Sequence, residues 1–180
     1  MSLTAQESEF LSRKIGRIPN NMERQIVAAE WSEHCSYKSS KKHLTMLPTT
    51  GPNVINEKGF DSGVLDVGDD YVVTVHIESH NHPSAVEPYG GAATGVGGVI
   101  RDILSAGTRP IALIDGLRFG DIENDTHARW LFKNAVSGIA DYGNCLGIPT
   151  IGGEVEFDNC YKGYALVDVA AIGFGKKNRL

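Results

Sequence analysis

Residues 76–104 read HIESHNHPSAVEPYGGAATGVGGVIRDIL, and the pattern in and around this stretch decides the fold class. A β-branched run at residues 71–77 leads into it and predicts a strand. Residues 90–98 carry five glycines, which predict a glycine-rich loop. Apolar residues then recur at helical spacing up to Leu104, and Gly107 would end that helix. The stretch therefore predicts a strand, a glycine-rich loop and an amphipathic helix in succession.

The flanking segments continue this alternation of strands and helices. Residues 64–67 and 71–77 predict a β-hairpin around a turn at residues 68–70. Three further apolar runs predict strands at residues 111–117, 148–151 and 164–174.

Asp125 can cap a helix that runs to about residue 142. The positions expected to face inward in this helix are Leu131, Ala135, Ile139 and Tyr142. Together these segments predict an α/β (α+β) fold, a mixed sheet with helices on one face.

The amino-terminal residues are predicted to be helical. Thr4 and Glu7 have the spacing of a capping box, and Gly16 would end the helix that follows. A second helix is expected from Asn21 to about Cys35. We therefore expect a helical arm in this part of the chain.

The boundary between arm and domain is expected near residue 48. Residues 36–62 are polar at first and then punctuated by proline and glycine, which predicts a long loop. The arm at residues 1–48 carries a candidate site, because His34 lies at a predicted helix end and Tyr37 with Lys38 could face a nucleotide. Residues 49–180 then form the α/β domain.

The composition excludes several classes of protein. Of the 180 residues, 41% are hydrophobic and 22% charged, and no apolar run approaches the roughly 20 residues of a membrane helix. The chain start shows no secretory signal, and the three cysteines form no Cys-x-x-Cys pair. No basic tract favours nucleic acid. We expect a cytoplasmic protein with neither a nucleic-acid nor a membrane partner.

The histidine cluster has two functional interpretations. In an extended chain, His76, Glu78, His80 and His82 would share one face. In the first interpretation His76, His80 and His82 bind zinc in a hydrolase. In the second, Glu78 binds Mg²⁺ and the histidines handle substrate and protons.

The second interpretation needs a phosphate site and another carboxylate nearby. The glycines of residues 90–98 would present backbone N–H groups at a helix N-terminus, where an anion can bind. Arg101 and Asp102 would lie in the first turns of that helix, where arginine can grip a phosphate and aspartate can hold Mg²⁺.

Three motifs resemble one family. They are EWSEHCSYKSSKKHL at residues 30–44, ESHNHPSAVEPYGGAATGVGGVIRDILSAGTRPIAL at 78–113 and PTIGGEVEFD at 149–158. Together they resemble the amino-terminal part of the phosphoribosylformylglycinamidine synthase family, within the aminoimidazole ribonucleotide synthetase-like ATP-binding superfamily. The resemblance implies an ATP- and Mg²⁺-dependent ligase of purine biosynthesis. Its reaction converts formylglycinamide ribonucleotide to an amidine with ammonia from a glutaminase subunit or domain.

The resemblance also implies roles for individual residues. His34 and His80 match catalytic positions, the latter as proton acceptor, and Tyr37 and His76 match ATP contacts. Glu78 and Asp102 match magnesium ligands. The positions that match substrate contacts are Ser79, His80, Asn81, His82 and Arg101.

Two departures from the family matter. His76 stands where the family usually has lysine, which weakens a fixed positive charge. Family members are also several times longer, so we expect a fragment that lacks complete activity. In this superfamily the sheets of two such domains pair as a barrel, so we expect the fragment to form a homodimer. A module that only dimerises remains the non-catalytic alternative.

Overall fold

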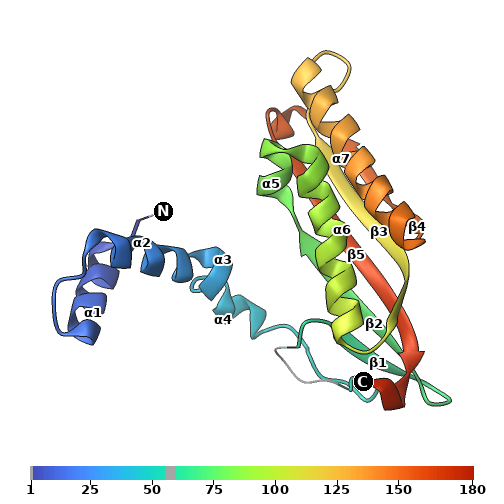
Figure 1. Cartoon of the computed structure of the whole chain (residues 1–180), viewed down its shortest axis with the longest axis horizontal. Coiled ribbons are helices and arrows are strands. Elements are labelled where there is room, and N and C mark those ends of the chain that lie inside the picture. The colour runs from blue at the N-terminus through green and yellow to red at the C-terminus, as the bar shows by residue number, and fades with distance from the viewer. Residues whose placement is uncertain (1, 56–59) are drawn as a thin grey trace. The chain divides into compact units, whose positions relative to one another are not determined.

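The computed structural model describes residues 2–55 and 60–180, which divide into two compact units, Met1–Pro48 and Thr49–Leu180. In Figure 1 the first unit is blue and the second runs from green to red. Each unit is described by itself. No helix in the described residues is both long and apolar enough to cross a bilayer.

The amino-terminal unit consists of four helices. They are α1 (Ala5–Ile15), α2 (Asn21–Glu30), α3 (Glu33–Ser36) and α4 (Lys41–Leu44). The capping box at Thr4 and the glycine stop at Gly16 are confirmed, and Asn20 forms a second capping box with Glu23.

The expected single helix up to Cys35 is wrong. α2 ends at Glu30, and the Ser32 side chain caps the separate turn α3. A serine hydroxyl that accepts a backbone N–H competes with helix continuation, which explains the break. Helix α4 also interrupts the loop predicted for residues 36–62, and residues 56–59 of that prediction lie outside the described residues.

The second unit is built on a five-stranded mixed sheet in the order β1-β2-β5-β3-β4. The β1–β2, β2–β5 and β5–β3 pairs are antiparallel, and the β3–β4 pair is parallel. The predicted hairpin is the β1–β2 pair. The strands are β1 (Gly63–Gly68), β2 (Tyr71–Ser79), β3 (Arg109–Phe119), β4 (Thr150–Phe157) and β5 (Ala165–Lys176).

Helices α5 (Asn81–Val86), α6 (Pro88–Ser105) and α7 (Thr126–Leu146) lie over one face of this sheet (Figure 1). The core lies between α6, α7 and the strands, and its fully buried members include Val96, Val99, Ile103, Leu131, Leu113, Phe119 and Val167. The expected mixed sheet with helices on one face is confirmed. Tyr142, expected inward, is 40% exposed, although its ring lies next to Gly97 of α6.

The glycine-rich run is helical, so the predicted loop is wrong. α6 begins at Pro88, and all of residues 90–98 lie inside it. These glycines allow close backbone packing. A Cβ at Gly91 would lie 2.6 Å from the Ser84 backbone nitrogen, and one at Gly138 of α7 would overlap the Tyr89 carbonyl oxygen. Tertiary contact here outweighs the low helix propensity of glycine.

The opposite face of the sheet carries several exposed apolar side chains. Alternation along the strands places Val75 and Ile77 of β2 on this face, and Ile77 is 67% exposed. Ile114 of β3 is in register with Ile77 through Ala170 of β5, and Phe174 of β5 pairs with Val73 on the same face. Ile114 and Phe174 are 38% and 39% exposed. The described helices of this unit leave these side chains open.

Candidate functional site

The end of strand β2 separates the four predicted site residues into two groups. β2 ends at Ser79, and His80 is the N-cap residue of α5. The strand alternation therefore does not extend to His82, which lies in α5, so that part of the expectation is wrong. The His80 side chain still lies on the α6 side of the sheet, where a Cβ on Gly95 would be 3.1 Å from the His80 Cβ. Within residues 2–55 and 60–180, the group that could share a metal ion is His76, Glu78 and Asp102, which leaves the three-histidine zinc site without its geometry.

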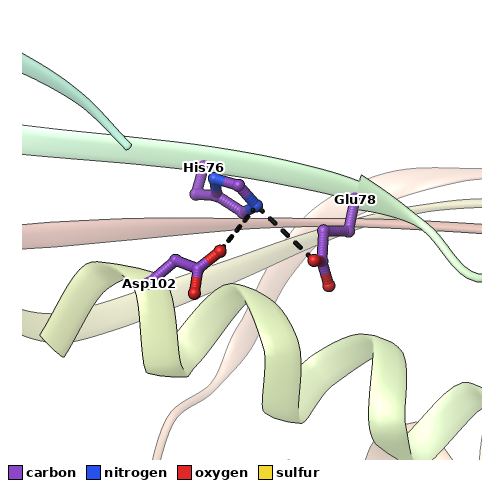
Figure 2. A group of neighbouring side chains, drawn as sticks. All are labelled: His76, Glu78 and Asp102. Atoms are coloured by element: carbon purple, nitrogen blue, oxygen red, sulfur yellow. Dashed lines mark ion pairs between the residues drawn. The ribbon is translucent and has the colours of Figure 1, made fainter. Parts of the chain in front are cut away.

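The side chains of His76 and Glu78 point from β2 toward Asp102 on α6 (Figure 2). The His76 Nε2 atom lies 3.3 Å from Asp102 Oδ2 and 3.8 Å from Glu78 Oε1. One ligand atom from each residue lies within 4.8 Å of the others. Asp102 is only 7% exposed, whereas the Glu78 side chain is 30% exposed, so two carboxylates and an imidazole converge at a partly buried position.

Close approach of α6 to β2 makes this cluster possible. A Cβ on Gly98 would overlap the Glu78 carboxylate, and a Cβ on Gly95 would lie 3.1 Å from the His80 Cβ. The glycines therefore shape the site by leaving space for side chains from β2 and α5. They do not form the predicted phosphate loop.

Arg101 lies late in α6, so its predicted place in the first turns is wrong. Its Nε donates to Asp102 Oδ1 over 2.8 Å, and its Nη2 lies 4.0 Å from Glu78 Oε1. The hydrogen bond with Asp102 raises the pKa of Arg101. The guanidinium is 70% exposed and remains accessible to an anionic ligand.

The segment after β2 is anchored on strand β5. The backbone N–H of His80 donates to the Val167 carbonyl over 2.7 Å, and Asn81 Oδ1 accepts from the Val167 N–H over 2.7 Å. His82 Nδ1 lies 3.1 Å from the Tyr164 hydroxyl. Tyr164 was not among the predicted residues, because no local pattern links positions 82 residues apart.

Ser79 lies on the other face of the sheet. It pairs in register with Asp168 of β5, beside an ionic group formed by Arg118 with Glu154 and Glu156. Burial raises the pKa of Asp168, and Arg118 opposes this effect. Sequence reasoning missed this group, although PTIGGEVEFD contains two of its carboxylates.

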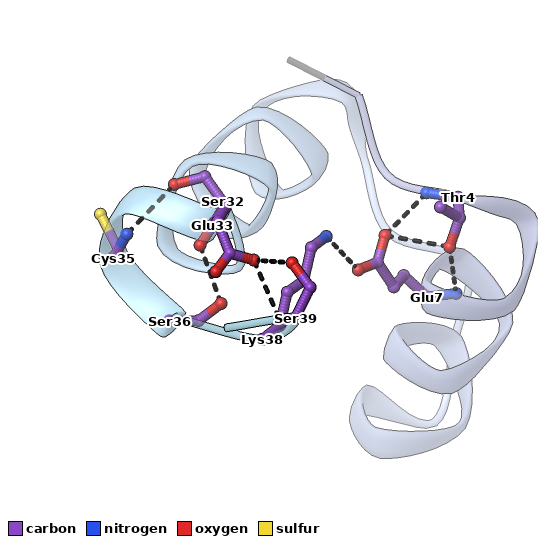
Figure 3. A network of polar contacts seen from close by, with 8 residues as sticks. All are labelled: Thr4, Glu7, Ser32, Glu33, Cys35, Ser36, Lys38 and Ser39. Atoms are coloured by element: carbon purple, nitrogen blue, oxygen red, sulfur yellow. Dashed lines mark hydrogen bonds and ion pairs between the residues drawn. The ribbon is translucent and has the colours of Figure 1, made fainter. Parts of the chain in front are cut away.

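His34 and Tyr37 belong to the amino-terminal unit and are both exposed. Figure 3 shows polar contacts of the neighbouring residues Glu33, Lys38 and Ser39. The Glu33 carboxylate accepts from the backbone N–H groups of Ser39 and Ser40 over 2.9 and 3.0 Å, and also from both hydroxyls. The hydroxyls, followed by the amides, lower the pKa of Glu33 to about 2. Tyr37 adopts a left-handed conformation with φ of 50° at the turn that this network closes.

The Glu7 carboxylate also stabilises the turn at Tyr37. Lys38 Nζ lies 2.6 Å from Glu7 Oε1 of α1. Hydrogen bonding with Lys38, and then with Thr4, lowers the pKa of Glu7 to about 2. Glu33 and Glu7 were not among the predicted site residues, although Glu33 is adjacent to His34.

Two family models match the chain. Residues 59–174 match the N-terminal domain of AIR synthase related proteins, and residues 1–38 match the formylglycinamide ribonucleotide amidotransferase linker domain. The division between these matches follows the two units of the structure.

Individual relatives agree with these family matches. Phosphoribosylformylglycinamidine synthase subunit PurL of Caldanaerobacter subterraneus subsp. tengcongensis is 53% identical over all 180 residues, which span 24% of that protein. Structures of T. maritima PurL complexed with ATP and with FGAR are each 42% identical, with TM-scores of 0.81. They match 98% and 97% of this chain and 28% and 27% of their own.

The chain thus spans about a quarter of the curated relative that it matches. A more distant structure, AaThiL complexed with AMPPCP and TMP, shares 13% identity with a TM-score of 0.54 and supports the fold alone. The match over residues 59–174 shows the family directly. The chain belongs to the AIR synthase related protein family, whose N-terminal domain it contains.

Proposed function

We propose that this chain is part of an ATP-dependent ligase that converts formylglycinamide ribonucleotide and ammonia to formylglycinamidine ribonucleotide. The observation that carries this proposal is the convergence of the half-buried Glu78 of β2 and the buried Asp102 of α6. Its support from relatives is 53% identity to a PurL subunit and the likeness to T. maritima PurL complexed with ATP and with FGAR.

The reaction requires two displacements. The amide oxygen of the substrate attacks the γ-phosphorus of ATP, the bond to the bridging oxygen breaks, and ADP leaves. Ammonia then adds to the activated carbon, the carbon–oxygen bond breaks, and inorganic phosphate leaves as the nitrogen loses a proton. Catalysis of such steps depends mainly on positioning and on neutralising phosphate charge.

Glu78 and Asp102 provide the ligands that Mg²⁺ prefers. Carboxylate oxygens are hard donors, and the space above Gly98 accommodates the Glu78 carboxylate, so these residues fit the ion. Mg²⁺, when bound, would neutralise charge on the nucleotide phosphates. Tyr37 and His76 would contact the nucleotide.

The segment from Ser79 to His82 would bind the ribonucleotide, with Arg101 gripping its phosphate or amide region. His80 would accept the proton that the attacking nitrogen loses, because its backbone is fixed on β5 and its Nδ1 is buried without a hydrogen-bond partner in the described part of the chain. His34 would act as the second catalytic histidine.

The complete protein would also need partners. A glutaminase subunit or domain would supply ammonia, the remaining synthetase domains would complete the site, and the reaction would take place in the cytoplasm. The exposed apolar face of β2, β3 and β5 fits a second sheet of the same kind.

An isolated chain would therefore form a homodimer through this face. Light scattering at tens of micromolar should give twice the monomer mass, and Ile77→Asp should halve it. A monomeric mass for the unmodified chain would contradict the pairing.

The enzymatic proposal is tested on the intact protein that contains this chain. Phosphate release from ATP should require both formylglycinamide ribonucleotide and ammonia. His80→Ala and Asp102→Asn should each lower the rate roughly a hundredfold or more, because a proton acceptor or a metal ligand is lost. His127→Ala, which changes an exposed histidine on α7, serves as the control. Unchanged rates in both site variants would favour a module that only dimerises.

A further inference from the structure

The His76 imidazole has an unusual position for a histidine that lies between two carboxylates. Its Nε2 atom is buried and has no hydrogen-bond partner within the described residues, although Asp102 Oδ2 and Glu78 Oε1 lie 3.3 and 3.8 Å away. Buried polar atoms are nearly always paired, so this atom requires an explanation. In Figure 2 the nitrogen points into the space that both carboxylates face.

The distances fit a shared metal ion. Two bonds of about 2.1 Å each, typical of nitrogen and oxygen ligands, can join atoms up to about 4.2 Å apart. Both measured separations from Nε2 are shorter than this sum. An ion at this position would bind the imidazole lone pair and one oxygen from each carboxylate.

The ligand orientation is already set by the surrounding chain. Arg101 Nε holds Asp102 Oδ1 over 2.8 Å, which leaves Oδ2 directed at His76. Gly98 leaves space for the Glu78 carboxylate. Hydrogen-bond partners that orient a metal ligand commonly strengthen metal binding.

We propose that His76, Glu78 and Asp102 form a three-ligand site for a divalent first-row transition ion, with His76 Nε2 as the nitrogen ligand. A mixed nitrogen and oxygen set favours ions such as Mn²⁺ over Mg²⁺, which prefers oxygen. The inference rests on the proposed function only for the use of the ion with ATP. Binding itself is measured without turnover.

Mn²⁺ is the probe, because its free form is counted directly by electron paramagnetic resonance. The 180-residue chain should bind Mn²⁺ at least tenfold more tightly than Mg²⁺ in competition. His76→Gln should weaken Mn²⁺ binding by roughly tenfold, while Mg²⁺ binding changes less than threefold. His127→Gln, which changes an exposed histidine on α7, should bind both ions as the unmodified chain does.

A spectroscopic measurement on the unmodified chain is independent of how any variant folds. Electron spin echo modulation of bound Mn²⁺ should show coupling to a directly bound ¹⁴N nucleus. Equal affinity for the two ions, or bound Mn²⁺ without this nitrogen coupling, would overturn the inference. If Mn²⁺ binds as expected but the intact protein releases no phosphate, the proposed function fails and the metal site stands.

Discussion

The two units hold their candidate functional residues in opposite ways. In the amino-terminal unit, the carboxylates of the exposed Glu33 and the half-buried Glu7 bind backbone amides, hydroxyls and a lysine around Tyr37. In the α/β unit, a buried core presses the glycine face of α6 against β2 and α5. The amino-terminal arrangement depends on hydrogen bonds and ion pairs of charged groups, whereas the arrangement in the α/β unit depends on the space that the glycines leave. The two sets of residues should therefore respond to different perturbations.

The largest expected effect comes from filling space in the α/β unit. Gly138→Ala would push a Cβ into the Tyr89 carbonyl oxygen, so that α6 and α7 must separate. Overpacking of this kind typically costs about 1–3 kcal/mol. Gly152→Ala in β4, where a Cβ meets nothing within 4 Å, is the matched control. Thermal unfolding of both variants measures the difference, and equal melting temperatures would show that backbone contact between α6 and α7 is unimportant.

The stability of the two units should respond differently to acid. The pKa values of Glu7, Glu23 and Glu33 are lowered to about 2, mainly by hydrogen bonds from Lys38, Arg17 and Ser39 respectively. A carboxylate whose pKa is lowered in the folded protein stabilises the folded state at pH values above its ordinary pKa near 4.5. This stabilisation is lost as the pH falls toward 2.

The α/β unit differs because two of its carboxylates have raised pKa values, although those of Asp66, Asp121 and Asp158 in the same unit are lowered. Burial raises the pKa values of Asp115 and Asp168, so protonation of these groups favours the folded state as the pH falls. We expect the amide signals of residues 2–48 to lose dispersion first in an NMR titration from pH 5 to pH 2. If the signals of the sheet lost dispersion before those of residues 2–48, the expected order would be wrong.

Capping should matter more in the amino-terminal unit, because its helices have little core. Asn20 accepts from the Glu23 N–H over 2.9 Å, and Asn20→Ala should lower the free energy of unfolding of this unit by about 1 kcal/mol. Asn134→Ala changes an asparagine inside α7 that only bonds back to the Trp130 carbonyl, and it should have less effect. Denaturant titrations followed by hydrogen exchange would compare the two, and a larger loss from Asn134→Ala would reverse the expected order.

The smallest effect should be local to the Tyr37 turn. Glu33→Gln removes the charge that binds Ser39 and Ser40, so their amides should exchange several-fold faster while α1 and α2 remain folded. Glu30→Gln, an exposed change at the end of α2, provides the control. Unchanged exchange at both serines would mean that the turn does not need the carboxylate.

Local signals predicted much of the fold. The capping box at Thr4, the β1–β2 hairpin and the apolar stripes of α6 and α7 depend on neighbouring residues, so the sequence predicts them directly. The resemblance directed attention to Glu78 and Asp102, which the structure places together.

The errors arose where distant contacts decide local structure. The glycines within residues 90–98 predict a loop because glycine has a low helix propensity. In the structure they form the face of α6 that packs against Ser84, His80 and Glu78. The period of a strand predicted His82 on the face of His76, yet β2 ends at Ser79, and the Val167 carbonyl accepts the His80 N–H at the start of α5. Neither contact is visible from sequence spacing alone.

The central claim is that the glycine face of α6 creates the ion-binding cluster by leaving space for Glu78. Mn²⁺ binding to Gly98→Ala, compared with the unmodified chain and Gly152→Ala, tests this claim most directly. Because the added Cβ overlaps a flexible side chain, the account predicts a folded variant whose affinity falls at least tenfold, with Gly152→Ala unchanged. A folded Gly98→Ala chain that binds Mn²⁺ as tightly as the unmodified chain would contradict the account.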